Sequence, residues 1–96
     1  MAMKRLDDSE VTQALEALPG WKRQGGAIEK TFDRGSFNGA ISFVNTLAQL
    51  AERADHHPDL DIRYSKVRVA LSTHDAGGLT QRDLDLARQV EAVGAG

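Results

Sequence analysis

All three histidines of this 96-residue chain, His56, His57 and His74, lie in the stretch between Glu52 and Asp83. Histidine is the side chain whose ordinary pKa, about 6.5, lies closest to neutrality, so it can both donate and accept a proton at physiological pH. A cluster of histidines in one stretch therefore suggests acid–base chemistry. Because imidazole is also a common metal ligand, a metal site is the alternative.

His56 lies at the expected end of a helix, where the helix dipole favours a protonated imidazole and so suits a proton donor. Glu52 precedes it by four residues on the same helical face, and we expect this carboxylate to pair with His56 and orient it. Pro58 forces His57 out of the helical conformation, so the His57 ring should point elsewhere. His74 ends a later strand, and we expect it to converge with His56 on one pocket.

A zinc site is the less favoured interpretation. Three histidines that bind zinc must converge on the metal with bonds of about 2 Å, whereas the adjacent His56 and His57 are expected to diverge. The chain has no His-Glu-x-x-His pair, which is the usual helical zinc motif. We therefore expect neither a bound metal nor another cofactor.

Each of these residues also has a purely structural explanation. His57-Pro58 could simply end the helix, Glu52 could be a solvated charge, and Asp83 is most simply a helix cap. On residue types alone, surface histidines at the ends of elements explain the pattern as well as a site does.

Three amphipathic helices and two hairpins are expected to position this stretch. The predicted helices span about 8–18, 37–55 and 81–93, and the predicted strands span about 21–23, 27–34, 60–64 and 66–73. Capping boxes at Asp7-Glu10 and Thr80-Asp83, and an N-cap at Ser36, mark the helix starts. The order predicts an α+β fold with an antiparallel sheet that carries helices on one face.

Two apolar features have more than one interpretation. Trp21 is expected in the core rather than stacked on a substrate, because aromatic side chains dominate cores. The second helix carries an additional apolar edge of Phe43, Leu50 and Ala54. This edge is a candidate subunit interface, although a wide core stripe explains it nearly as well.

Composition narrows the function classes. The length predicts a single domain over residues 1–96, and small cores are often completed by oligomerisation. The net charge of −2, with lysine and arginine spread along the chain, argues against direct nucleic-acid binding. The absence of cysteine excludes disulfides, thiolate metal sites and a cysteine nucleophile. With no apolar run long enough for a membrane span and no signal-like N-terminus, we expect a cytoplasmic protein.

The spacing Glu52-x3-His56-His57-Pro58-x5-Tyr64-x9-His74-x8-Asp83 closely resembles the signature of the pterin-4a-carbinolamine dehydratases. That family is also known in animals as a dimerisation cofactor of a homeodomain transcription factor. Trp21 and the flanking helices and strands match as well, so the resemblance covers most of the chain.

The resemblance implies a four-stranded antiparallel sheet with three helices packed on one face, in the order α-β-β-α-β-β-α, and dimers that often pair into tetramers. It implies a dehydratase that removes water from 4a-hydroxytetrahydropterin to give quinonoid dihydropterin. This reaction recycles the tetrahydrobiopterin-type cofactor of aromatic amino acid hydroxylases and requires no redox step, metal or nucleophile.

The resemblance also implies roles for individual residues. His56 and His74 are the leading acid–base pair, His57 mainly holds the pterin, and Glu52 orients His56. The implied substrate-binding residues are Asp55, His56, His57, Ser72, Thr73, His74 and Asp75. Two alternatives stay open: an oligomeric binding or regulatory module of the same fold, and a relative that acts on another pterin.

Overall fold

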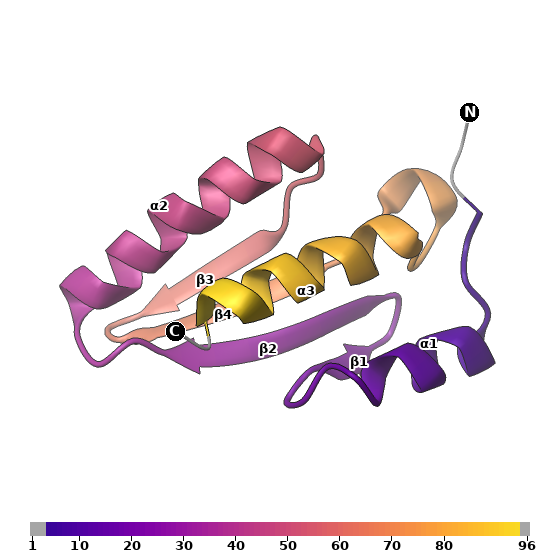
Figure 1. Cartoon of the computed structure of the whole chain (residues 1–96), viewed down its shortest axis with the longest axis horizontal. Helices are drawn as coiled ribbons and strands as arrows, with labels where there is room; N and C mark the ends of the chain where they lie inside the picture. The colour runs from indigo at the N-terminus through magenta and orange to yellow at the C-terminus, as the bar shows by residue number, and fades with distance from the viewer. Residues whose placement is uncertain (1–3, 95–96) are drawn as a thin grey trace.

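Four antiparallel strands form a single sheet in the order β1-β2-β4-β3, and three α-helices accompany it (Figure 1). The computed structural model describes residues 4–94. In chain order the elements are α1 (Asp8–Leu15), β1 (Lys22–Gln24), β2 (Ala27–Asp33), α2 (Phe37–Ala54), β3 (Asp59–Arg63), β4 (Lys66–Leu71), the 3-10 helix η1 (His74–Ala76) and α3 (Gln81–Gly94). The predicted α+β order of helices and strands is confirmed.

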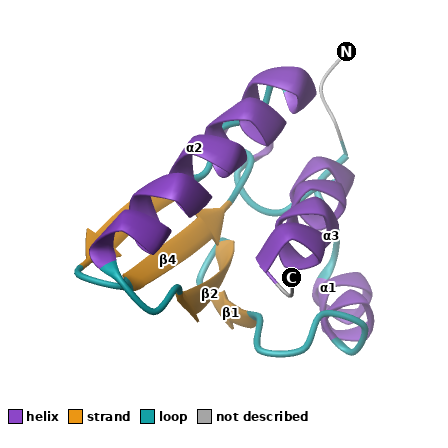
Figure 2. Ribbon diagram, turned by 60° about the vertical axis from the view of Figure 1, so that its left-hand side comes forward, coloured by secondary structure: helices purple, strands orange, loops and turns teal. Residues whose placement is uncertain are grey.

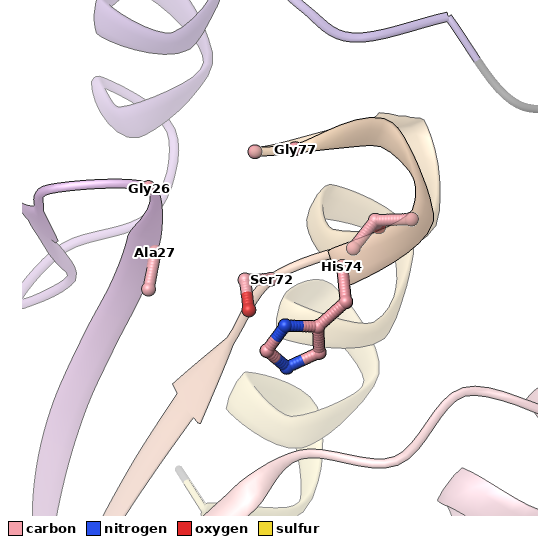
Figure 3. A pocket seen from close by; sticks show the side chains of 7 residues that line it. Gly26, Ala27, Ser72, His74 and Gly77 are labelled. Atoms are coloured by element: carbon pink, nitrogen blue, oxygen red, sulfur yellow. The ribbon is translucent and has the colours of Figure 1, made fainter.

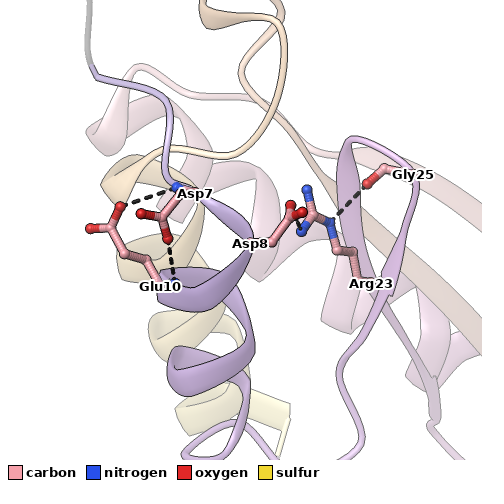
Figure 4. A network of polar contacts seen from close by, with 5 residues as sticks. All are labelled: Asp7, Asp8, Glu10, Arg23 and Gly25. Carbon is pink, nitrogen blue, oxygen red and sulfur yellow. Dashed lines mark hydrogen bonds and ion pairs between the residues drawn. The ribbon is translucent and has the colours of Figure 1, made fainter.

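The helices cover the sheet unevenly. α2 and α3 pack against each other over one face of the sheet, and α1 lies beyond α3, near β1 (Figure 2). An ion pair of 2.7 Å between Arg23 and Asp8 ties β1 to α1 (Figure 4). No helix within residues 4–94 is both long and apolar enough to cross a membrane.

The strands alternate between an apolar and a charged face, as the twofold periodicity of a strand requires. In the register, Ile28 pairs with Leu71 and Leu60 with Val69. The buried face carries Ile28, Phe32, Val67, Val69 and Leu71. On the other face Arg68 lies 2.5 Å from the carboxylate of Glu29. The helices therefore have one apolar surface to pack on.

The predicted helix starts are largely confirmed. The Asp7 side chain accepts from the Glu10 backbone and the Glu10 side chain accepts from the Asp7 backbone, which completes the first capping box (Figure 4). Ser36 caps α2 by accepting from the backbone N–H of Gly39 at 2.9 Å. α1 is shorter than predicted because its hydrogen bonds tighten to a spacing of three residues before Pro19.

The strand bounds differ from the prediction by one or two residues, most clearly at the ends of β4 and β3. β4 ends at Leu71 rather than Thr73, because Thr73 leaves the ladder and forms an isolated bridge with Gly78. Tyr64, which was predicted to end the preceding strand, lies instead in the turn between β3 and β4. It has a left-handed φ of 55° there, and its surface is 88% exposed.

The core is centred on Phe32. Its ring lies 6.1 Å from Trp21 and 5.1 Å from Phe43, measured between ring centroids. Phe43 is only 4% exposed, and Leu50 and Ala54 pack against the same cluster. The second apolar edge of α2 is therefore part of a wide core stripe, and the interface interpretation of Phe43 is wrong.

Trp21 is a core residue, as predicted, and its indole N–H anchors α3. Its Nε1 donates to Glu91 Oε1 at 2.9 Å, and Lys30 Nζ donates to the same oxygen at 2.7 Å. Burial raises the pKa of Glu91, but the hydrogen bonds from Lys30 and Trp21 outweigh it, so the pKa of this carboxyl is lowered from its ordinary 4.5. The charged form of Glu91 therefore stabilises the fold.

This network predicts an acid-sensitive component of stability. Because the folded-state pKa of Glu91 is lowered, its contribution is fully present above pH 4.5 and is lost as the pH falls through the folded-state value. The change Glu91→Gln should lower the free energy of unfolding by about 1–3 kcal/mol near neutral pH. The free energy of unfolding of this variant should also fall less steeply than that of the wild type as the pH is lowered. Urea unfolding followed by Trp21 fluorescence measures both, with Glu16→Gln as the control. Equal pH dependence in wild type and Glu91→Gln would contradict the assignment.

Candidate active site

A cavity of about 280 Å³ lies where α2, β4, η1 and α3 meet. Its lining residues are Asp55, His56, His57, Ser72, Thr73, His74, Asp75 and Arg82. All seven residues predicted to bind substrate therefore surround one cavity. Their role in binding stays a prediction, but the convergence of His56 and His74 on a shared space is a property of the structure.

The end of α2 explains how His56 reaches this cavity. The backbone N–H of Asp55 donates to Glu52 O at 3.3 Å, and that of His56 donates to Ala51 O at 3.1 Å. These two bonds form a Schellman motif, which requires a left-handed residue between the helix and the following chain. Asp55 supplies it with φ 50° and ψ 44°. The turn reverses the chain direction, so His56 is buried while His57 stays exposed.

Asp83 holds His56 in place. His56 Nε2 and Asp83 Oδ1 are joined by a hydrogen bond of 2.5 Å, and Asp83 is fully buried. Its other oxygen, Oδ2, accepts from Thr73 Oγ1 at 2.8 Å and from the backbone N–H of Thr80 at 2.9 Å. The hydroxyls of Thr73 and Thr80 lie 2.9 Å apart. Both oxygens of a buried carboxylate are thus satisfied, as burial of a charge demands.

Asp83 is consequently more than a helix cap. It accepts from Thr80 N, which is half of the predicted capping box, but its own N–H donates to the Thr80 backbone carbonyl at 3.1 Å. The other hydrogen bonds of the carboxylate are made with His56 and Thr73. The sequence contained the signal, because Asp83 lies at a motif position, but local capping explained it well enough to hide its longer-range role.

The predicted pairing of Glu52 with His56 is wrong. Glu52 Oε2 instead bonds His57 Nε2, and both side chains are exposed. The physical reason is the left-handed turn at Asp55, because it removes His56 from the helical surface that the four-residue spacing assumed. Glu52 therefore lies outside the cavity, and its contact with the cavity is through His57.

His74 lines the same cavity from a different element, η1. It opens η1 instead of ending a strand, and its exposed ring projects near the Ser72 hydroxyl (Figure 3). Within residues 4–94, the His74 ring makes no hydrogen bond or ion pair, in contrast to the rings of His56 and His57. Its nitrogens are therefore available to a ligand.

Arg82 is the lining residue that the sequence pattern did not single out. It occupies the first turn of α3 and has no ion-pair partner among the described residues. A cation at a helix N-terminus opposes the helix dipole. That unfavourable placement is the one signal that could have drawn attention to it.

The arrangement offers two proton-transfer groups in different environments. One imidazole is buried and oriented by a carboxylate, and the other is exposed and unpaired, which is the geometry that general acid–base catalysis uses. Within the described part of the chain, no cluster of three or more histidine or acidic side chains is arranged to hold a metal ion. The two imidazoles themselves are groups that can transfer protons.

Comparison with known proteins decides the family. Residues 4–93 match the family model of Pterin 4 alpha carbinolamine dehydratase. The chain belongs to the pterin-4a-carbinolamine dehydratase family. The family membership expected from the histidine motif is confirmed.

Sequence relatives of this dehydratase family member align over nearly their whole length. A protein from Roseiflexus sp. (strain RS-1), provisionally assigned as a pterin-4-alpha-carbinolamine dehydratase, is 56% identical over 89 residues, 93% of this chain and 96% of that protein. A relative with the same provisional assignment from Nocardia farcinica (strain IFM 10152) is 50% identical over 93 residues, 97% of this chain and 98% of that protein.

Solved structures share the fold. The crystal structure of a transcriptional coactivator/pterin dehydratase from Brucella melitensis has a TM-score of 0.91 at 38% identity and covers 95% of this chain and 99% of that chain. A pterin dehydratase-like protein identified as a RuBisCO assembly factor in the alpha-carboxysome has a TM-score of 0.63 at 23% identity and covers 77% of this chain and 86% of that chain. The second likeness shows the fold alone.

The left-handed conformation of Asp55 makes a testable prediction about stability. Glycine adopts this conformation without steric strain, whereas for alanine it is unfavourable by about 1–2 kcal/mol. Asp55→Gly should therefore be more stable than Asp55→Ala by about 1 kcal/mol. Urea unfolding of the two variants measures the difference. At Ala48, which lies within α2, the order should be reversed: Ala48→Gly should be less stable than the wild type, because glycine lowers helix stability. If Asp55→Ala were the more stable variant, the chain would not turn as described.

Proposed function

We propose that this protein removes water from a 4a-hydroxytetrahydropterin to give a quinonoid dihydropterin, with His56 and His74 transferring the protons. The observation that carries the proposal is the convergence of these two imidazoles on one cavity. Membership of the dehydratase family supports the choice of a pterin carbinolamine as substrate.

The reaction balances without an oxidant or reductant. A base takes the proton from N5 of the pterin, and the electron pair of that N–H bond forms the double bond between N5 and C4a. The bond from C4a to the hydroxyl oxygen breaks as an acid protonates that oxygen, and water leaves. The two protons thus move at neighbouring atoms, so two groups that line one cavity can serve them.

The environments of the two histidines favour a division of roles. Asp83 engages Nε2 of His56, and within residues 4–94 the Nδ1 nitrogen of that ring has no hydrogen bond. A carboxylate placed in this way orients the ring and stabilises the imidazolium that forms when the ring takes a proton. We assign His56 as the base toward N5 and His74 as the acid toward the departing hydroxyl. His57, Asp55, Ser72, Thr73 and Asp75 would bind the pterin, with Glu52 acting through His57.

The physiological setting that we propose is recycling of a tetrahydrobiopterin-type cofactor in the cytoplasm, by a homodimer or homotetramer. A different pterin as substrate is the close alternative. The assignment of the reaction depends on the proton-transfer site and is independent of which pterin is used.

Turnover of purified protein with a 4a-hydroxytetrahydropterin tests the reaction. His56→Ala and His74→Ala should each lower kcat by about 10²–10⁴-fold, the usual contribution of a general acid or base. His57→Ala should mainly raise KM, because we assign it to binding. Circular dichroism of each variant serves as the folding control. Wild-type rates in both His56→Ala and His74→Ala would refute their roles, and an inactive wild type would refute the enzyme.

Asp83 supplies a second test of the mechanism. Asp83→Asn keeps the size of the side chain but removes its charge, so kcat should fall by at least about tenfold while KM changes little, because His56 loses the carboxylate that stabilises its protonated form. Asp83→Ala should in addition lower the free energy of unfolding by about 3–5 kcal/mol, since it leaves buried partners unpaired. Asp85→Asn, a change at an exposed carboxylate in the same helix, is the matched control. An unchanged kcat in Asp83→Asn would contradict the role of the carboxylate.

A binding or regulatory module is the second candidate function. It is favoured by the exposed apolar side chains of Phe37, Leu60 and Tyr64, and by the description of the Brucella melitensis relative as a transcriptional coactivator/pterin dehydratase. Purification of a stoichiometric protein complex from a wild type without turnover would support it. An active wild type that forms no such complex would argue against it.

A further inference from the structure

The hydroxyl groups of Thr73 and Thr80 form a pair beside Asp83 that the mechanism above does not use. Thr80 is fully buried, and Thr73 is 9% exposed. Their oxygens lie 2.9 Å apart, and Thr73 Oγ1 also lies 2.8 Å from Asp83 Oδ2. Each hydroxyl has a single proton, so the donor of each bond follows from counting protons.

Thr80 is the donor of the bond between the two hydroxyls. Within residues 4–94, Thr73 Oγ1 is the only hydrogen-bond partner of Thr80 Oγ1. Because the Thr80 side chain is fully buried, its O–H group cannot turn to bulk solvent. A buried O–H group without an acceptor is strongly unfavourable. The Thr80 proton therefore points at Thr73.

Thr73 in turn donates to Asp83. Its oxygen accepts the Thr80 proton, so its own proton is directed at Asp83 Oδ2. The backbone N–H of Thr80 donates to the same oxygen at 2.9 Å. These two donors occupy both lone pairs of Oδ2, so this oxygen acts only as an acceptor. The hydrogen bonds therefore run in series, from Thr80 to Thr73 and from Thr73 to Asp83.

The same two donors fix the orientation of the carboxylate. Thr73 follows β4 and Thr80 precedes α3, so Asp83 is held from two separate segments. Its free oxygen, Oδ1, is thereby directed at His56 Nε2, 2.5 Å away. A ring nitrogen that faces a carboxylate carries the proton, and the other nitrogen of a neutral ring keeps a free lone pair. For His56 that other nitrogen is Nδ1, and a free lone pair is what a base needs.

Thr73 lines the cavity between His56 and His74, yet both of its protons are engaged inside the protein. Its O–H donates to Asp83, and its backbone N–H donates to Gly78 O at 2.9 Å. It has no proton left to donate to a ligand. Its position in the wall of the cavity therefore does not by itself make its hydroxyl a binding group.

We propose that Thr73 and Thr80 are positioning residues for the base His56: their hydroxyls act in series on Asp83, and the carboxylate holds the His56 proton on Nε2. This role rests on the proposed function, because it assumes that His56 is the base. It moves the Thr73 hydroxyl from ligand binding to positioning. It also adds Thr80, which lies outside the cavity lining.

The position of the His56 proton can be measured without substrate. The changes His57→Gln and His74→Gln together leave His56 as the only histidine of the chain. The chemical shifts of its ring nitrogens, measured by NMR at a pH at which the ring is neutral, should show the proton on Nε2. Adding Thr73→Val should make this proton exchange with solvent at least about fivefold faster, because the carboxylate loses one of its two anchors.

Kinetics test whether the two hydroxyls act on the reaction. Thr73→Val should lower kcat about tenfold and change KM by less than about twofold, because it disturbs the base and not the binding of substrate. Thr80→Val acts only through Thr73 and should lower kcat less, by about threefold. Thr73→Ser and Thr80→Ser keep the hydroxyl and should restore kcat. The control is Thr46→Val, which removes a hydroxyl bond to Ser42 O outside the cavity.

Three outcomes would overturn the proposal. A His56 ring with its proton on Nδ1 would contradict the direction of the hydrogen bonds, and this measurement decides even if a valine variant does not fold. A raised KM with unchanged kcat in Thr73→Val would make its hydroxyl a binding group. Lower stability with unchanged kcat in both valine variants would make the pair purely structural.

Failure of the proposed function would look different. A wild type that turns over no 4a-hydroxytetrahydropterin would refute the reaction. The tautomer of His56 and the exchange of its proton would then still show whether Thr73 and Thr80 position the ring.

Discussion

The buried carboxylate of Asp83 is the constraint on which the candidate site depends. A carboxylate that is removed from water needs a hydrogen-bond partner for each oxygen, because the burial of an unpaired charge strongly destabilises the folded state. Asp83 finds them in His56 after α2, in Thr73 after β4 and in Thr80 before α3. Satisfying one carboxylate therefore brings three separate parts of the chain to one point, and that point is the wall of the cavity.

The position of α3 is determined at both of its ends. Asp83 anchors the first turn to the site, while Glu91 in the last turns accepts from Trp21 and Lys30 at the other end of the core. Between them Leu84, Leu86, Ala87 and Val90 are buried. Polar anchors at two ends and apolar packing between them set both the distance and the rotation of the helix. The site thereby acquires a rigid wall, which is what a catalytic geometry requires.

Three residues of one type lie in different surroundings. His56 is buried against a carboxylate, His57 is exposed beside Glu52, and His74 is exposed without a partner in the described chain. The imidazole itself is the same in all three. Orientation, solvent access and the neighbouring charge make one of them a candidate base, one a candidate binding group and one a candidate acid.

The sequence alone determined the features that depend on near neighbours: the helices, the caps at Asp7 and Ser36, the two hairpins and the apolar face of the sheet. Their signals are periodicity and spacing, which the chain carries locally. The resemblance of the histidine motif to a known family also supplied the family and every residue of the cavity lining except Arg82. Only the tertiary structure decided which carboxylate holds His56, because a left-handed Asp55 moved the ring from Glu52 to a residue 27 positions along the chain. The same holds for Arg82 and for the hydroxyl pair of Thr73 and Thr80, since both arise from segments that meet only in the folded protein.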